Sequence, residues 1–232
     1  MNKSVSYWLE AEYKRQMPGI AQDANPAKVM AARLSKLLTQ WRERFNEHAE
    51  ITSSWFVRST DKAVSSSVTH ALNTAGMSVK MRNTPELKNV LAATYQTQVS
   101  LIKSIPEQYL TQVDLLVQES VSRGRDIAWL RDELQQRYGV TRRRAIMIAR
   151  DQNNKATNAI AVERNIAVGV TEGIWEHHSG GSKTYRQSHV KAGNDKLKFD
   201  LRKGAYIGGQ WIMPGELPNC NCTFRPVVPG FA

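Results

Sequence analysis

The sequence is short of cysteines, of long apolar runs and of acidic residues, and each shortage excludes a class of protein. With two cysteines in 232 residues, a disulfide framework is excluded, and the composition is typical of a chain made in a reducing cytoplasm. No stretch of about 18 or more apolar residues is present, so we predict no membrane-spanning helix. The N-terminal residues contain no apolar core followed by a small-residue cleavage site, so we expect no secretory signal.

The shortage of acidic residues leaves a strongly basic protein. Lysine and arginine total 32 against 21 aspartate and glutamate residues, a formal charge of +11. Such a surface attracts polyanions, of which nucleic acid is the usual one. Two other interpretations stay open: the charge keeps the protein soluble, or it docks on an acidic protein. The length, with 41% hydrophobic residues, is enough to bury a core.

The first two-thirds of the chain have the periodicity of helices. Apolar residues recur at spacings of three and four after Pro26, namely Leu34, Leu37, Leu38, Trp41 and Phe45. No proline interrupts residues 27–84, so this stretch predicts one very long helix or two stacked ones. The boundaries that we predict for the following helices are Pro85, Pro106 and Gly124, then Asp126 and Gly139, then Thr141 and about Val168.

After Gly169 the helical spacing disappears and glycine, proline, lysine and aromatic residues dominate. Short strands are predicted at VTEGIWEHH, GQWIM and NCTFRPVV, and a turn or hairpin loop at SGGSKTY. The predicted fold class is therefore α+β, with a mainly α-helical N-terminal two-thirds and a small β-hairpin-rich C-terminal module.

Basic residues form two groups that could contact DNA. The segment TRRRAIMIAR contains the first group, which is Arg142, Arg143, Arg144 and Arg150. Three consecutive arginines spread over about 200° of a helix, so at least one must face solvent and could bind phosphate without reading sequence. A solvated face, or pairing with acidic residues of other helices, is the alternative. The second group is Lys183, Arg186, Lys191, Lys196, Lys198, Arg202 and Lys203.

Cysteine and histidine occur together in the C-terminal module, which is a pattern typical of zinc sites. The predicted ligands are His189, Cys220 and Cys222, and His177 or His178 would have to complete a set of four. Two small buried thiols without a metal are the alternative. A Cys–His nucleophile would need a base or a helix N-terminus to lower the pKa of the thiol, and no partner acid is apparent beside Cys220. We therefore predict no enzymatic activity and no required cofactor, with zinc as the one candidate.

Three landmarks in residues 121–232 resemble the phage head morphogenesis family, also called Mu F-like minor head proteins. They are IARDQNNKATNAIAVERNIAVG, which resembles the family's "IARTE…N…A…G" helix, IWEHHSGGSKTYRQSHVKAG, which resembles its "W…R..H…G" hairpin, and PGELPNCNC, which resembles its "P…HPNCRC" terminus. The preceding segment RDIAWLRDELQQRYGVTRRRA is similar to the family's helical lead-in. The resemblance divides the chain into a helical docking region, residues 1–120, and a Mu F-like module, residues 121–232, with helices over 126–168 and strands over 170–232.

The sequence departs from the family pattern at several positions. Asp151 and Gln152 replace the family's Thr-Glu, Leu217 replaces the histidine before Pro-Asn-Cys, and Asn221 replaces the arginine between the cysteines. In members with a C-x-x-C in the hairpin, those cysteines align with Arg186 and His189. The resemblance then leaves at most His189, Cys220 and Cys222 from a four-ligand set.

The resemblance implies a minor capsid protein of a tailed bacteriophage that acts in head morphogenesis. Its expected partners are the portal protein, the major capsid protein and packaged double-stranded DNA, and its expected place is the head interior or portal vertex of the virion, after synthesis in the host cytoplasm. One alternative is an enzymatic effector injected with the genome that uses His189 and Cys220. Because some members carry a toxin domain after the head module, the end of the sequence at Ala232 predicts that no such domain follows. Another alternative is a helical scaffold that binds an acidic protein and no DNA.

Overall fold

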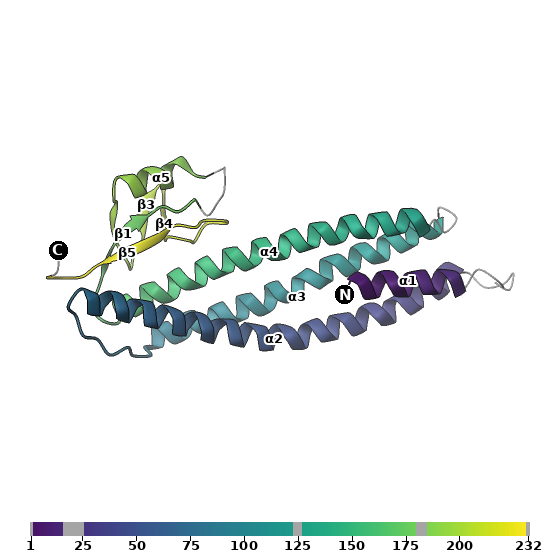
Figure 1. Cartoon of the computed structure of the whole chain (residues 1–232), viewed down its shortest axis with the longest axis horizontal. Helices are drawn as coiled ribbons and strands as arrows, with labels where there is room; N and C mark the ends of the chain where they lie inside the picture. The colour runs from purple at the N-terminus through teal and green to yellow at the C-terminus, as the bar shows by residue number, and fades with distance from the viewer. Residues whose placement is uncertain (1, 16–25, 123–126, 180–184, 231–232) are drawn as a thin grey trace. The chain divides into compact units, whose positions relative to one another are not determined.

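The structure is a computed structural model that describes residues 2–15, 26–122, 127–179 and 185–230 (Figure 1). Four helices, α1 (Asn2–Arg15), α2 (Pro26–Thr74), α3 (Pro85–Ser122) and α4 (Ile127–Ile166), precede a small mixed module. The module contains β1 (Glu172–Glu176), α5 (Gln187–Asn194), β2 (Lys198–Asp200), β3 (Ala205–Ile207), β4 (Gln210–Ile212) and β5 (Thr223–Val227). The predicted α+β class is confirmed.

Of the two alternatives for residues 27–84, the single long helix is correct as far as Thr74, and glycine follows its end. Helix α2 has 49 residues. Beyond it, the amide of Met77 donates to the carbonyl of Leu72, and Gly76 has a φ of 84°. This is the left-handed closure that glycine adopts without strain. Helix α4 ends in the same way, with Val170 donating to Asn165 and Gly169 at a φ of 88°.

Three predicted helix boundaries, which belong to two predicted breaks, are wrong. Pro106 lies inside α3 and starts no helix. An internal proline costs about 3 kcal/mol, but the burial of Tyr109, Leu110 and Val113 just beyond it outweighs that cost. Gly139 and Thr141 likewise lie inside α4, where glycine costs only about 1 kcal/mol relative to alanine. The Thr141 hydroxyl donates to the carbonyl of Arg137, as a helix-interior threonine does.

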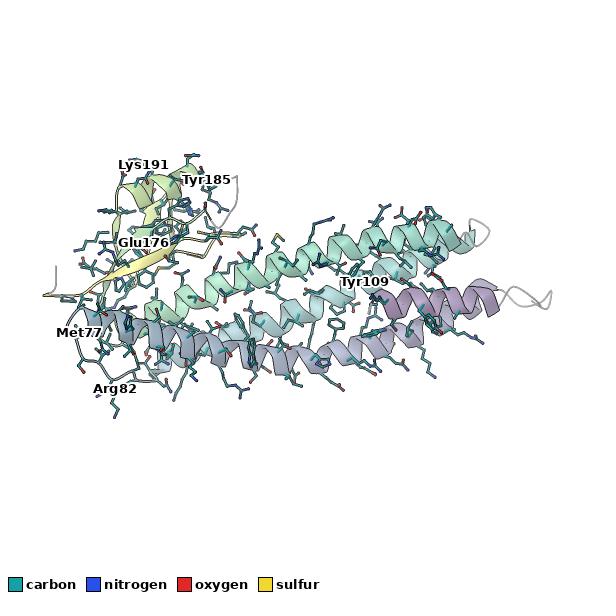
Figure 2. All side chains as sticks on the ribbon, in the orientation of Figure 1. Met77, Arg82, Tyr109, Glu176, Tyr185 and Lys191 are labelled. Atoms are coloured by element: carbon teal, nitrogen blue, oxygen red, sulfur yellow. The ribbon has the colours of Figure 1, made fainter. Side chains whose placement is uncertain are left out.

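The chain forms two compact units, each built from separate stretches of sequence. Unit 1 contains residues 1–52 and 99–146, and unit 2 contains residues 53–98 and 147–232. The described core of unit 1 is helical, and the buried side chain of Tyr109 lies within it (Figure 2). Its other fully buried residues include Val5, Leu9, Leu34, Leu110, Val113 and Leu130. The sequence division at residue 120 stays a prediction, since compact units and sequence families need not share a boundary.

Unit 2 contains the module and parts of three helices. Strands β2, β1 and β5 form an antiparallel sheet in that order, and β3 pairs with β4 in a hairpin. Trp175 in β1 stands opposite Phe224 in β5, and its side chain is buried. One core joins α2, α3 and α4 residues to the sheet, and it includes Val64, Leu72, Leu87, Ile160, Trp175, Phe199, Leu201, Ile207 and Ile212. The module therefore has no core of its own and is part of unit 2.

A buried arginine anchors the connection between α2 and α3 in unit 2. Arg164 on α4 is 4% exposed, and its guanidinium donates to the Asp61 carboxylate, with a nitrogen–oxygen distance of 2.7 Å. The same group donates to the carbonyl of Arg82, which is labelled in Figure 2, and to the side chain of Asn83. A charge this deep is tolerated because each of the three guanidinium nitrogens donates to an acceptor and one acceptor is a carboxylate.

Candidate functional site

The three predicted metal ligands come together in unit 2. His189 lies on α5, and Cys220 and Cys222 lie in the loop before β5. All three side chains are buried, and their ligand atoms lie within 4.8 Å of one another. The Nδ1 atom of His189 is 3.5 Å from the Cys220 sulfur and 3.6 Å from the Cys222 sulfur. The local prediction of a hairpin around His189 is wrong, since residues 187–194 are helical.

The structure distinguishes His177 from His178, which the sequence could not do. The Nδ1 atom of His177, just after β1, lies 3.5 Å from the Cys222 sulfur. His178 points elsewhere, because its Nε2 atom lies 3.0 Å from the hydroxyl of Thr223. Aromatic rings pack edge-on against both site histidines, Tyr185 against His177 and Trp175 against His189. These contacts orient the two imidazoles.

Backbone amides surround the two sulfur atoms. The N–H groups of Cys222 and Gly215 point toward the Cys220 sulfur, and the N–H of His178 toward the Cys222 sulfur. A hydrogen bond from the Cys222 thiol, aided by these amides, lowers the pKa of Cys220. The same hydrogen bond and burial raise the pKa of Cys222.

Helix α4 holds the cysteine loop through polar residues that sequence reasoning missed. The side-chain amide of Asn154 donates to the carbonyl of Cys220, and that of Asn158 to the carbonyl of Cys222. One turn earlier, Asp151 accepts from the backbone amide of Asn219 at 2.8 Å. The spacing of four between the two asparagines places them on one helix face, and this was the available signal.

A polar pocket of about 630 Å³ opens over the cluster. Its lining comes from α4, from the residues after β1, from α5 and its approach, and from the cysteine loop. Besides the residues already described, it includes Arg150, Tyr185 and Arg186. Cys220 lines this pocket but is only 3% exposed, so the thiol that the enzymatic alternative requires is largely shielded from solvent.

The first basic group divides into exposed and anchored arginines. Arg142 and Arg143 are exposed on α4 in unit 1, and Arg150 is exposed on α4 in unit 2. Within the described part of the chain, none of these three guanidinium groups has an acidic partner within 4 Å. Arg144 is half-buried and donates to the hydroxyl of Ser104 on α3.

The second basic group belongs to the module, and several of its charges are paired. Lys191 and Lys198 form exposed ion pairs with Asp195 and Glu172, and Arg186 donates to the carbonyl of Pro218. Lys183 lies outside the described residues. Three members are exposed and have no ion pair among the residues that the structure places, namely Lys196, Arg202 and Lys203.

A search of the helices among the described residues finds none long and apolar enough to cross a membrane. This agrees with the prediction from hydropathy.

Comparison with known proteins gives a family and one distant relative. A family model described as "Phage Mu protein F like protein" matches residues 111–225. A Haemophilus influenzae protein described as an "Uncharacterized protein" is 25% identical over 249 residues, which cover 98% of this chain and 54% of that protein. The chain thus spans about half the length of this relative. No solved structure matches.

The family match and the fold agree in their landmarks. The matched stretch contains α4, α5, the Cys-x-Cys loop and the three-stranded sheet as far as the first half of β5, and these segments carry the resemblance. Through residues 111–225, the chain belongs to the family of phage Mu F-like proteins, a family of phage head morphogenesis.

Proposed function

We propose that this protein is a minor capsid protein of a tailed phage that docks on the portal or the inner capsid and contacts the packaged double-stranded DNA. The family supports head morphogenesis, and the charge of +11 supports contact with a polyanion. The residence that we propose is the head interior or the portal vertex of the virion.

The observation that carries the DNA contact is the set of exposed arginines without acidic partners on α4. Arg142 and Arg143 neighbour each other and carry free guanidinium groups, in the sense that no described carboxylate lies within ion-pair distance of either. An arginine with no acidic partner gives up no ion pair when it binds a phosphate, whereas an ion-paired arginine must first break its existing pair. Arg144 contributes less in this account, because its guanidinium is held against Ser104.

Contact of this kind is sequence-independent and sensitive to salt. Each phosphate that is neutralised releases counterions, so the logarithm of affinity falls with the logarithm of salt concentration at about 0.9 per phosphate contacted. Two arginines that each bind one phosphate should contribute about 2 to that slope. The module's exposed Lys196, Arg202 and Lys203 would add to the same dependence.

A filter-binding titration against salt tests the assignment. We expect Arg142→Glu with Arg143→Glu to weaken binding to duplex DNA of any sequence and to reduce the salt slope by about 2. The matched control is Arg131→Glu with Arg137→Glu, which makes the same change of charge on the same helix. These two arginines are already paired with Glu10 and Glu133, so the control should change the slope much less. Equal slopes for the first variant and the parent protein would contradict a DNA contact here.

A further inference from the structure

We infer that His177, His189, Cys220 and Cys222 bind one zinc ion in a closed, structural site. The inference is independent of DNA contact and concerns how the module is held together. It differs from the ligand set that the family resemblance implies, because Arg186 occupies one of those positions. A guanidinium has no lone pair to offer a metal, and Arg186 donates instead to the carbonyl of Pro218.

Three of the sulfur–nitrogen distances are those of a tetrahedral zinc site, and His177 would have to move closer to the other ligands, because only His189, Cys220 and Cys222 have ligand atoms that all lie within 4.8 Å of one another. With zinc–sulfur bonds of about 2.3 Å and zinc–nitrogen bonds of about 2.0–2.1 Å, a sulfur and a nitrogen on one tetrahedral zinc lie about 3.5 Å apart. Three such separations occur here. They are 3.5 Å between His189 and Cys220, 3.6 Å between His189 and Cys222, and 3.5 Å between His177 and Cys222.

The surroundings of the sulfur atoms are built for thiolates. The indole N–H of Trp175 is buried and makes no hydrogen bond of good geometry with any described residue, and it lies beside the Cys222 sulfur. Such donors stabilise metal-bound thiolates, whereas two neutral thiols would not need them.

The four ligands come from three segments, so the ion would join the end of β1, helix α5 and the cysteine loop. The α5 backbone already lies close to His177, since a Cβ added at Gly193 would be 2.7 Å from the His177 Cβ atom. Asn154 and Asn158 fix the loop carbonyls of Cys220 and Cys222 from α4. The metal would add His177, which already lies beside Cys222, to three ligands that the protein brings together.

Metal content and cobalt spectroscopy test the inference on the full chain. We expect the protein purified without chelator to contain one zinc per chain. Cobalt added to the metal-free protein should give the intense visible bands of tetrahedral coordination and a thiolate-to-cobalt charge-transfer band in the near ultraviolet. A parent protein that takes up neither metal, or that gives the weak spectrum of octahedral cobalt, would overturn the inference.

Paired variants test the ligand set. Zinc affinity of His177→Ala should fall by more than the roughly 10- to 100-fold typical of losing an outer-shell partner, and the cobalt spectrum should change. The adjacent His178→Ala is the control and should keep stoichiometry and spectrum, because His178 faces Thr223. If His177→Ala binds zinc as tightly as His178→Ala, His177 is not a ligand. If circular dichroism shows that His177→Ala does not fold, the parent protein provides the test. A chelator should lower the melting temperature of the parent protein, and an unchanged melting temperature would contradict a structural metal.

Discussion

Removal of the Asp61 carboxylate should destabilise unit 2 far more than removal of an exposed carboxylate. Arg164 is 4% exposed and has three acceptors, of which only Asp61 carries charge. In Asp61→Ala the guanidinium stays buried with two neutral acceptors and no counter-charge. Leaving one member of a buried pair uncompensated typically costs about 3–5 kcal/mol. Because the Asp61 side chain is itself 23% exposed, we expect the lower end of this range, about 3 kcal/mol.

A double-mutant cycle separates the ion pair from other effects of the substitutions. Arg164→Met removes the buried charge and leaves the Arg82 carbonyl and the Asn83 side chain without a donor, at about 1–3 kcal/mol. In the double variant no buried charge is left uncompensated. The double variant should therefore lose about 2 kcal/mol less free energy of unfolding than the two single variants lose in sum. A difference of this size is within the range observed for residues in contact.

Urea unfolding followed by tryptophan fluorescence measures these free energies, because the buried Trp175 reports on unit 2. Asp195→Ala is the control, since the Lys191–Asp195 pair is exposed, and it should change the free energy of unfolding by less than about 1 kcal/mol. The reasoning is refuted if Asp61→Ala costs no more than Asp195→Ala, or if the losses of the two single variants simply add in the double variant.

Two further substitutions test the packing around the candidate site. Asn158→Leu leaves the Cys222 carbonyl without its donor and should lower the free energy of unfolding by about 1–3 kcal/mol. Asn153→Leu, at an exposed position on the same helix, is the control and should change this free energy by about 0.5 kcal/mol or less. Equal effects of the two substitutions would contradict the role given to Asn158. Gly193→Ala places a methyl group against His177 and should cost about 1–3 kcal/mol, measured by thermal unfolding, and an unchanged melting temperature would show that α5 moves aside freely.

The long helices could be predicted from the sequence because their apolar spacing is regular and survives local interruptions. The boundaries at Pro106, Gly139 and Thr141 were wrong because local propensity is weaker than tertiary burial. Residues such as Tyr109 and Leu134 are buried on either side of these breaks, and a continuous helix is the conformation that buries both flanks. The identity of the residues at these three positions does not indicate how much apolar surface the neighbouring residues bury in the folded protein.

The sequence predicted which residue types form the candidate site, but it did not predict the residues that hold the cysteine loop in place. The Cys-x-Cys pair and His189 are recognisable because cysteine and histidine are rare in this chain. The choice between His177 and His178 depends on which of two adjacent side chains points inward after β1, and the sequence has no signal for the strand's last residue. Asn154 and Asn158 escaped notice because polar residues in a helix usually face solvent, whereas here the cysteine loop covers them. Helix α5 was missed because its glycine and polar residues resemble those of a turn.

Mass spectrometry of purified phage heads can establish whether this protein is part of the particle. We expect peptides from residues 111–225 in mature heads, at low copy relative to the major capsid protein and retained after nuclease and high-salt washing. Purified heads that lack these peptides, from cells that make the protein, would contradict a role as a component of the particle.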